Sequence, residues 1–324
     1  MAVEFTSGDT LSPEVWDEFV WNANNGTIFH TKQFLSYHPG DRFTDQSYVI
    51  HKKDQPFALF PAVRLMYDGR DTLFSHRGAS YGGFVHQEDL SIREAYDLVE
   101  GLLNVAQASG VEQIVMTPPP AIYNRRVTNY VDFALYKHGF QYLKREISSM
   151  LTLESSIEGN LGKFRSSSRR NYRKAKREGV KVRQTDDYEK FYGILRKNLK
   201  IRHDVEPTHT LDELRLLAEI FPDRVRLFGA YLNETMIAGV VNFTCNRDVL
   251  LAFYISHDEE YQEYRAVNLL FYEIIRWSIE RRLNYLDFGI FTVNEEPNFG
   301  LGRFKESFGA SGVFRDTFVK TLSD

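Results

Sequence analysis

The sequence predicts a protein of mixed α and β structure with two domains. Apolar runs that are typical of strands alternate with longer helical segments, and one order of elements (strand, strand, strand, helix, strand) occurs once in each half of the chain. A chain of 324 residues is also long for a single hydrophobic core. We therefore expect an α/β (α+β) fold in two domains, residues 1–150 and 151–324.

The first half begins with a predicted hairpin and closes with a strand that follows a long helix. This helix is expected to end at Gly110, because glycine is the usual residue after a last helical turn. The segments of this half are strands at residues 47–53, 56–69, 71–76 and 112–119 and a helix at residues 90–110.

The second half repeats this order, with a hairpin that is expected to turn at Asn233 and Glu234. Its segments are strands at residues 224–233, 235–245, 248–256 and 284–289 and a helix at residues 262–282. Between the two halves lie a predicted strand at residues 141–154 and predicted helices at residues 163–179, 187–202 and 211–222.

Composition excludes several classes of protein. The hydrophobic fraction of 43% and the charged fraction of 26% are ordinary for globular proteins. No apolar run approaches the roughly 20 residues of a membrane span, and the first residues lack the basic and apolar regions of a signal peptide. The single cysteine, Cys245, excludes disulfides, and the nine histidines show no metal-ligand spacing. We expect a cytoplasmic protein with no membrane span and no bound metal.

Residues 163–179 carry an unusual concentration of positive charge. Eight Lys or Arg residues less one Glu give a local charge of +7, which leaves −11 for the rest of a chain whose net charge is −4. Apolar or small residues at spacings of three and four predict a helix, followed by Gly179. Arg169, Arg170 and Arg173 are candidates for binding substrate phosphates, and a solvated basic helix is the alternative.

A short predicted strand near the end of the sequence carries a carboxylate. Residues 283–291, LNYLDFGIF, place Asp287 where an alternating buried strand would prefer an apolar residue, and the strand ends at Gly289. Sites gather at strand ends in α/β sheets. Asp287 is therefore a candidate catalytic base, and a structural hydrogen bond to the glycine turn is the alternative.

The following segment, NFGLGRFKESFGAS at residues 298–311, combines cations with phenylalanines and glycines. Its glycines predict a turn in which the backbone can approach a ligand closely. We expect Lys305 to be an exposed charge that faces the substrate, with Arg303 and Phe304 beside it in substrate binding. A solvated lysine in a surface loop is the alternative.

Three further residues are candidates for substrate binding. Tyr254, on the predicted strand at residues 248–256, could orient an acceptor amine, although such a tyrosine often belongs to the core. Arg77 and Tyr81 lie in the glycine-rich segment at residues 75–84 and are expected to line a cleft between the halves.

The element order resembles that of the GCN5-related N-acetyltransferase fold, and its doubling around a basic helix resembles the FemABX peptidyltransferases and their acyl-CoA N-acyltransferase relatives. Three segments carry this resemblance, and a fourth resembles the family more weakly. They are FRSSSRRNYRKAKREGVKV at residues 164–182, YLDFGI at 285–290 and LGRFKESFGA at 301–310, with TIFHTKQFLSYHP at 27–39 as the weaker match.

The resemblance implies two tandem acetyltransferase-like domains with mixed, mostly antiparallel sheets. It also implies N-acyl transfer to an amine, with Lys305 in the substrate-binding and catalytic role. Such a reaction needs a proton acceptor, a donor to the developing oxyanion, and walls that align the reactants. We expect the acceptor to be a small molecule that carries phosphate, such as a nucleotide-sugar or a cell-envelope precursor.

The donor implied by the resemblance is either acyl-CoA or aminoacyl-tRNA. Simple acetyltransferases bind the pyrophosphate of acetyl-CoA on a glycine-containing loop at a helix N-terminus, whereas the corresponding residues 259–270 contain no glycine. The family members that use tRNA often carry a long helical hairpin, and residues 187–221 are too short and too interrupted by proline to form one. This second observation favours acyl-CoA as the co-substrate.

A non-catalytic protein that binds an anionic polymer through the basic helix is a further alternative. The acidic remainder of the chain argues against an extended nucleic-acid footprint. Aromatic residues are also not interleaved with cations along a strand, as they are in single-strand readers.

Overall fold

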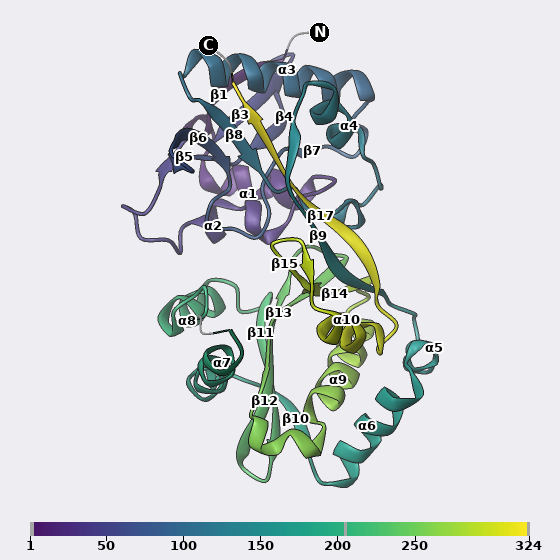
Figure 1. Cartoon of the computed structure of the whole chain (residues 1–324). Coiled ribbons are helices and arrows are strands. Elements are labelled where there is room, and N and C mark those ends of the chain that lie inside the picture. The colour runs from purple at the N-terminus through teal and green to yellow at the C-terminus, as the bar shows by residue number, and fades with distance from the viewer. Residues whose placement is uncertain (1–2, 204–205, 323–324) are drawn as a thin grey trace. The chain divides into compact units, whose positions relative to one another are not determined.

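The computed structural model describes residues 3–203 and 206–322, and the chain divides into two compact units (Figure 1). Unit 1 comprises residues 3–146 together with 314–322, and unit 2 comprises residues 147–313. Within the described residues, no helix is both long enough and apolar enough to cross a membrane. That residues 1–150 and 151–324 are two copies of one domain stays a prediction.

Unit 1 contains two sheets and four α-helices in its described part. Its helices are α1 (Pro13–Asn22), α2 (Lys32–Leu35), α3 (Ile92–Ala108) and α4 (Tyr130–Lys137), with short 3₁₀ turns at Gly8–Thr10, Ile28–His30 and Ala121–Tyr123. Its strands are β1 (Glu4–Ser7), β2 (Thr44–Asp45), β3 (Tyr48–Lys52), β4 (Gln55–Phe60), β5 (Val63–Tyr67), β6 (Arg70–Ser75), β7 (Val85–His86) and β8 (Gln113–Met116). Two long strands, β9 (Gln141–Thr152) and β17 (Ser311–Thr321), contribute residues to both units.

The predicted strand at residues 56–69 is divided between the two sheets of unit 1. One sheet has the order β1-β3-β4-β7, and the other continues from β17 through β8, β6 and β5 to β2. The division falls at Pro61, which lacks the N–H that a continuous ladder needs. Its carbonyl accepts the Ser75 hydroxyl, and the next N–H, that of Ala62, donates to Ser47 Oγ at 3.1 Å. The hairpin expected in the first half is therefore β3–β4, whereas β5 pairs with β6 in the second sheet.

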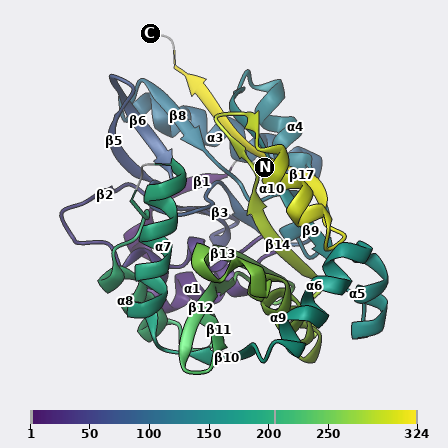
Figure 2. The same cartoon turned by 60° about the horizontal axis from the view of Figure 1, so that its bottom comes forward.

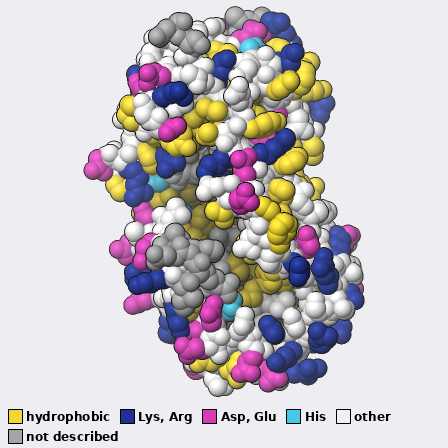
Figure 3. Space-filling view, in the orientation of Figure 1, with side chains coloured by type: hydrophobic (Ala, Val, Ile, Leu, Met, Phe, Trp, Pro, Cys, Tyr) yellow, Lys and Arg dark blue, Asp and Glu magenta, His cyan; other side chains and the backbone are white. Residues whose placement is uncertain are grey.

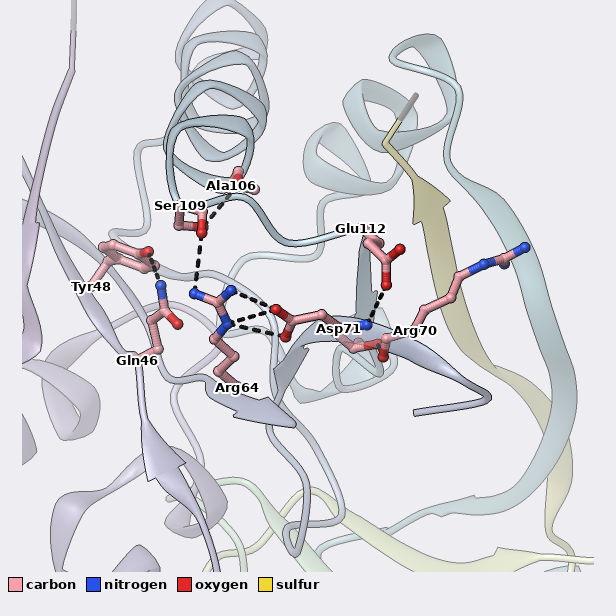
Figure 4. Close-up of polar contacts among 9 residues, drawn as sticks. Gln46, Tyr48, Arg64, Arg70, Asp71, Ala106, Ser109 and Glu112 are labelled. Carbon is pink, nitrogen blue, oxygen red and sulfur yellow. Dashed lines mark hydrogen bonds and ion pairs between the residues drawn. The ribbon is translucent and has the colours of Figure 1, made fainter. Parts of the chain in front are cut away.

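The Arg64 side chain links the β5–β6 hairpin to the end of α3 (Figure 4). The Arg64 guanidinium donates from Nε to the Asp71 carboxylate at 3.0 Å and from Nη1 to the Ser109 carbonyl at 3.1 Å. The Asp71 N–H in turn donates to Glu112 Oε2 at 2.7 Å. Because a bidentate pair fixes geometry as well as charge, this cluster sets the position of the strand that leads to Arg77.

Unit 2 is built on one sheet with the order β10-β11-β12-β13-β14-β9. Its strands are β10 (Lys181–Thr185), β11 (Val225–Leu232), β12 (Thr235–Thr244), β13 (Val249–His257) and β14 (Tyr285–Ile290), with the small ribbon β15 (Thr292–Val293) and β16 (Glu296–Pro297). Its helices are α5 (Ile157–Lys163), α6 (Ser166–Arg177), α7 (Tyr188–His203), α8 (Leu211–Ile220), α9 (Ala266–Glu280) and α10 (Phe299–Glu306), and a 3₁₀ segment spans Glu259–Tyr264.

The arrangement of unit 2 follows the predicted order of elements. The β11–β12 hairpin turns at Asn233, which adopts a φ of 52°, as the sequence predicted. Helix α9 connects β13 to β14, the parallel pair of this sheet, and the other pairings are antiparallel. Helices α6 and α9 lie on one side of the strands and α7 and α8 on the other (Figures 1 and 2). The prediction of mixed, mostly antiparallel sheets is confirmed.

Aromatic side chains form the centre of the core beneath α9. The Phe308 ring, which is fully buried, lies 5.1 Å from Phe164, 5.2 Å from Phe271 and 5.6 Å from Phe288 between ring centroids. Phe164 follows α5, Phe271 belongs to α9, Phe288 belongs to β14, and Phe308 follows the end of α10. Phe308 therefore joins four separate segments of unit 2.

Replacing Phe308 with alanine is expected to lower the free energy of unfolding by about 3 to 5 kcal/mol, because the cavity left among these rings cannot collapse fully. Denaturant unfolding of the Phe308→Ala variant measures this loss. The matched control is Phe299→Ala, since the Phe299 side chain is 74% exposed and its removal should cost no more than about 0.5 kcal/mol. Equal losses in the two variants would contradict this description of the core.

Candidate active site

Strands β13 and β14 separate after a short parallel contact. Their pairing runs from Val249 opposite Tyr285 to Leu251 opposite Asp287, although β13 continues to His257 and β14 to Ile290. The pairing of β14 with β9 also shifts its register after Asp287. Gly289 lies at this point with a φ of 74°, a backbone conformation that favours glycine. The end of β14 is therefore released from regular pairing, and its backbone groups can serve other partners.

Asp287 holds the turn at the end of β14. The side chain is fully buried, and its Oδ1 accepts the Ser148 hydroxyl at 2.6 Å and the Gly289 N–H at 2.7 Å. The hydrogen bond from the Gly289 N–H is the structural role for Asp287 that we expected as the alternative to a catalytic base. Ser148 was not predicted, because it lies on β9, far from Asp287 in the sequence, and only the strand register brings the two together.

Lys305 is buried next to this turn. Its side chain comes from α10, and Nζ donates to the carbonyls of Gly289 at 2.8 Å and Ile290 at 2.7 Å. Only 2% of the residue is exposed, so the expectation of an exposed charge is wrong. Burial lowers the pKa of Lys305 to about 8, and the opposing charge of Asp287 limits the decrease.

The ammonium of Lys305 retains hydrogen-bonding capacity. A protonated lysine has three N–H donors, and the two carbonyls use two of them. Among residues 3–203 and 206–322, no third acceptor is found for Nζ. A buried donor without a partner is costly, so the remaining N–H is suited to an oxygen of a bound molecule.

The segment around Lys305 is a helix, where the sequence predicted a turn. Asn298 begins α10 by accepting the Leu301 N–H on its side-chain oxygen at 3.0 Å. Gly302 lies inside the helix, and the absence of a side chain leaves room for the Phe291 ring, which a Cβ at this position would approach within 3.1 Å. Gly309, with a φ of 91°, follows the end of the helix. The glycines thus permit close packing of α10 and its termination.

The neighbours of Lys305 have different positions. Arg303 is exposed on α10, where it is open to a charged ligand. Phe304 is half-buried, and its ring contacts Phe308 at 5.1 Å and Phe271 at 6.2 Å between centroids. Phe304 therefore anchors α10 on the core, and its role in substrate binding stays a prediction.

The basic helix α6 is joined to the end of α10. The Ser168 hydroxyl donates to Ser307 Oγ at 2.7 Å, and the Arg165 N–H donates to the Ser307 carbonyl at 2.9 Å. An ion pair of 2.9 Å between Arg165 and Glu306 adds to this junction. The basic helix α6 and the Lys305 segment, which the sequence indicated as separate candidates, are therefore in contact.

The candidate arginines of α6 differ in their surroundings. Arg169 is half-buried and donates to the Leu161 carbonyl at 3.1 Å, which fixes the helix to α5. Arg170 and Arg173 are exposed. Figure 3 shows Lys and Arg side chains gathered over α6, at the lower right. Gly179, with a φ of 84°, follows the helix as predicted.

Tyr254 on β13 is tied to the segment between α7 and α8. Its hydroxyl accepts the His209 N–H at 3.1 Å and lies 2.9 Å from His209 Nδ1, while Tyr192 donates to the His209 carbonyl at 3.1 Å. Burial raises the pKa of Tyr254 to about 12, so the phenol stays protonated. His209 was not predicted, because nothing in the sequence distinguishes it from a loop histidine.

Arg77 and Tyr81 belong to unit 1. The Arg77 guanidinium is exposed and lies 5.6 Å from the Phe74 ring, whereas Tyr81 is buried with its hydroxyl 3.4 Å from that of Tyr123. Arg315 packs 5.5 Å from the Tyr81 ring and donates to Glu146 at 3.3 Å. A cleft between the halves that these residues line stays a prediction.

A surface cavity of about 360 Å³ lies between α7 and the start of β12. Its charged lining includes Lys197, which pairs with Asp258 at 3.3 Å, and Lys190, which pairs with Asp187 at 2.7 Å. None of its lining residues belongs to the Lys305 cluster. Within the described residues, no group of three or more His, Cys, Asp or Glu side chains is placed to hold a metal ion.

The family model described as "Acetyltransferase (GNAT) domain" matches residues 162–306. The chain carries a GNAT acetyltransferase domain. This match includes α6, Asp287 and Lys305, so the candidate residues of unit 2 lie within the GNAT domain. It makes the protein an acyltransferase and favours this interpretation over a non-catalytic binder of anionic polymers. No curated protein sequence matches the chain.

Solved structures show the same fold over the whole chain. FemX is 12% identical, with a TM-score of 0.76 and coverage of 98% of this chain and 97% of that one. A tandem GNAT protein from the clavulanic acid biosynthesis pathway is 10% identical, with a TM-score of 0.57 and coverage of 99% and 100%. The L-PGS structure from Bacillus licheniformis is 13% identical, with a TM-score of 0.59 and coverage of 97% and 93%. The predicted tandem GNAT-like, FemABX-like fold is confirmed.

The burial of Lys305 in the GNAT domain predicts a dependence of stability on pH. Its pKa is about 8 in the folded chain against 10.5 ordinarily, so between these values the unfolded chain binds the additional proton. Stability therefore rises with pH in this interval. Relative to a Lys305→Met variant, the wild type should gain about 3 kcal/mol from pH 8 to 10.5.

Denaturant unfolding of both proteins across this pH range provides the measurement. Other titrating groups are common to the two proteins, so their contributions cancel in the difference. A difference that stays constant from pH 8 to 10.5 would show that Lys305 titrates in the folded protein as it does in water.

Proposed function

We propose that this acyltransferase transfers an acyl group to an amine of a phosphate-bearing acceptor, at the end of β14. The observation that carries the proposal is the buried ammonium of Lys305, which two carbonyls position and whose third N–H has no acceptor in the described residues. A fixed donor in a dry site is the arrangement that stabilises a developing oxyanion without reorganisation.

The reaction requires few groups from the protein. The acceptor ammonium first releases one proton to solvent. The neutral amine then attacks the acyl carbonyl carbon to form the new C–N bond, and the carbonyl oxygen becomes an oxyanion that accepts the Lys305 N–H hydrogen bond. Collapse of this intermediate breaks the C–O or C–S bond to the carrier, and the second proton that the attacking nitrogen loses is transferred to the leaving oxygen or sulfur. Lys305 itself forms no covalent bond.

Asp287 serves this site by positioning its parts. Its carboxylate holds the Gly289 N–H at 2.7 Å and thereby fixes the turn whose carbonyls bind Lys305. Its charge also keeps the buried lysine protonated near neutral pH. The base role stays the alternative, and it requires that the acceptor amine reach the carboxylate in place of the Ser148 hydroxyl.

Replacing Lys305 with alanine should lower turnover by about 10²- to 10³-fold, the effect of removing one oxyanion donor. Steady-state kinetics of Lys305→Ala measures the loss, with Lys181→Ala as a control that removes an exposed lysine of the same unit. Thermal unfolding of each variant separates lost chemistry from lost structure. Normal turnover in a folded Lys305→Ala variant would contradict the proposal.

The pH profile of wild-type turnover tests the role of the same group. A donor must be protonated, so turnover should fall as pH rises through about 8. An activity that stays constant or rises through this pH would contradict the role of Lys305 as a protonated donor.

For the donor we propose aminoacyl-tRNA ahead of acyl-CoA. The segment before α9, where a simple acetyltransferase binds pyrophosphate, carries Glu259, Glu260 and Glu263 and contains no glycine. Carboxylates at a helix N-terminus oppose the binding of a pyrophosphate there. The exposed cations of α6, joined to α10 through Ser168 and Ser307, match a polyanionic carrier. This donor would also place the activity in the cytoplasm.

The α6 proposal predicts a salt-dependent affinity for tRNA. The double variant Arg170→Glu and Arg173→Glu should bind tRNA at least about ten-fold more weakly and with a smaller salt slope, because each phosphate contact releases counterions. Fluorescence anisotropy with labelled tRNA measures both. The control is Lys53→Glu with Arg70→Glu, which reverses two exposed charges in unit 1.

Transfer assays distinguish the two donors. Wild-type protein incubated with an amine acceptor and either labelled aminoacyl-tRNA or labelled acetyl-CoA should form product with the former. Product from acetyl-CoA alone, together with unchanged tRNA binding in the α6 variant, would assign acyl-CoA as the donor.

A further inference from the structure

One face of unit 1 combines exposed aromatic side chains with cations. Six aromatic side chains are strongly exposed in residues 3–203 and 206–322, and five of them belong to α4, β9 and β17. These five are between 41% and 64% exposed, and with Val127 they form what we call the aromatic face: Tyr130, Phe133, Tyr136, Tyr142 and Phe314. Figure 3 shows hydrophobic side chains gathered in this part of unit 1, at the upper right. Such clustering on a surface marks a site of interaction.

Contacts within unit 1 show that these residues form one surface. The Arg145 guanidinium lies between two of the rings, 4.4 Å from the Tyr142 centroid and 3.9 Å from that of Phe314, and pairs with Asp316 at 3.1 Å. Ala134 and Leu135 of α4 belong to the same buried cluster as Phe318 of β17, so α4 packs beside β17. The aromatic face therefore extends from α4 across to β9 and β17.

The segment that carries four of the five rings has a charge opposite to that of the whole protein. Residues 125–145 carry five cations and one acid, Asp132, for a local charge of +4, whereas the chain has a net charge of −4. Arg126 and Lys137 are exposed next to the aromatic side chains of α4. This second basic region is separate from α6 in the sequence and plays no part in the proposed transfer.

We propose that the aromatic face docks the protein on an anionic lipid surface. Tyr and Phe side chains can insert between the lipid headgroups, where the ring contacts the acyl chains and a Tyr hydroxyl contacts water. Flanking Lys and Arg side chains can extend to the lipid phosphates. A second copy of this chain would oppose the exposed cations Arg126 and Lys137 with an identical pair of cations. Charge complementarity thus selects the lipid.

Cosedimentation with vesicles tests this docking. Wild-type protein should bind vesicles of equal phosphatidylcholine and phosphatidylglycerol at least about ten-fold more tightly than pure phosphatidylcholine, and high salt should weaken the binding. Two double variants should each lose at least about ten-fold in binding: Phe133→Ser with Tyr136→Ser, and Arg126→Glu with Lys137→Glu.

Matched variants control for general effects of surface change. Val15→Ser with Met66→Ser removes two exposed apolar side chains elsewhere in unit 1, and Lys53→Glu with Arg70→Glu reverses two exposed charges. Both should bind the anionic vesicles as the wild type does. All of these positions are exposed, so circular dichroism and thermal unfolding should show every variant folded.

Three results would overturn the proposal. The first is equal binding of the wild type to anionic and neutral vesicles, and the second is wild-type binding by folded variants of the aromatic face. The third is a dimer in sedimentation velocity that the Phe133→Ser, Tyr136→Ser variant dissociates while no vesicles bind, which would assign the face to a second copy of the chain.

Discussion

The chemistry of unit 2 depends on a single buried cation. An ammonium taken out of water must be compensated by nearby oxygens, and here the carbonyls of Gly289 and Ile290 supply them. Those carbonyls become available where β14 ends its pairing with β13 and shifts its register against β9. At this point Gly289 adopts a positive φ that Asp287 stabilises. The packing of α10, the break in the sheet and the charge of Lys305 therefore form one interdependent structure.

Much of the fold could be predicted because its signals are local. The β11–β12 hairpin, helix α3 and the helix that Gly179 terminates each follow from patterns within a few residues. The division of residues 56–69 at Pro61 was missed because the hydrogen-bonding partners of that break, Ser47 and Ser75, lie outside the run. Local pattern does not reveal which of two sheets a strand joins.

The candidate site was predicted only in part, for a related reason. Residue type and order pointed to Asp287 and Lys305, but the glycines around Lys305 predicted a turn where the Asn298 cap and the Phe291 ring produce a helix. The burial of Lys305 and the contribution of Ser148 depend on strand register and tertiary packing, which a single sequence does not encode in any short pattern. Lysine is rarely buried, so residue type alone predicts an exposed side chain. The partners of Lys305 are backbone carbonyls, which no particular residue type in the sequence reveals.

The path of β17 has a consequence for biosynthesis. Unit 2 is one uninterrupted stretch, residues 147–313, whereas unit 1 requires residues 314–322, which follow all of unit 2 in the chain. Phe318 fills the unit 1 core, and the strand covers the edge of β8 from Gln113 to Met116. On the ribosome, residues 3–146 emerge before unit 2 but keep an uncovered strand edge while unit 2 is made, so unit 1 completes its fold only after unit 2 has been synthesised.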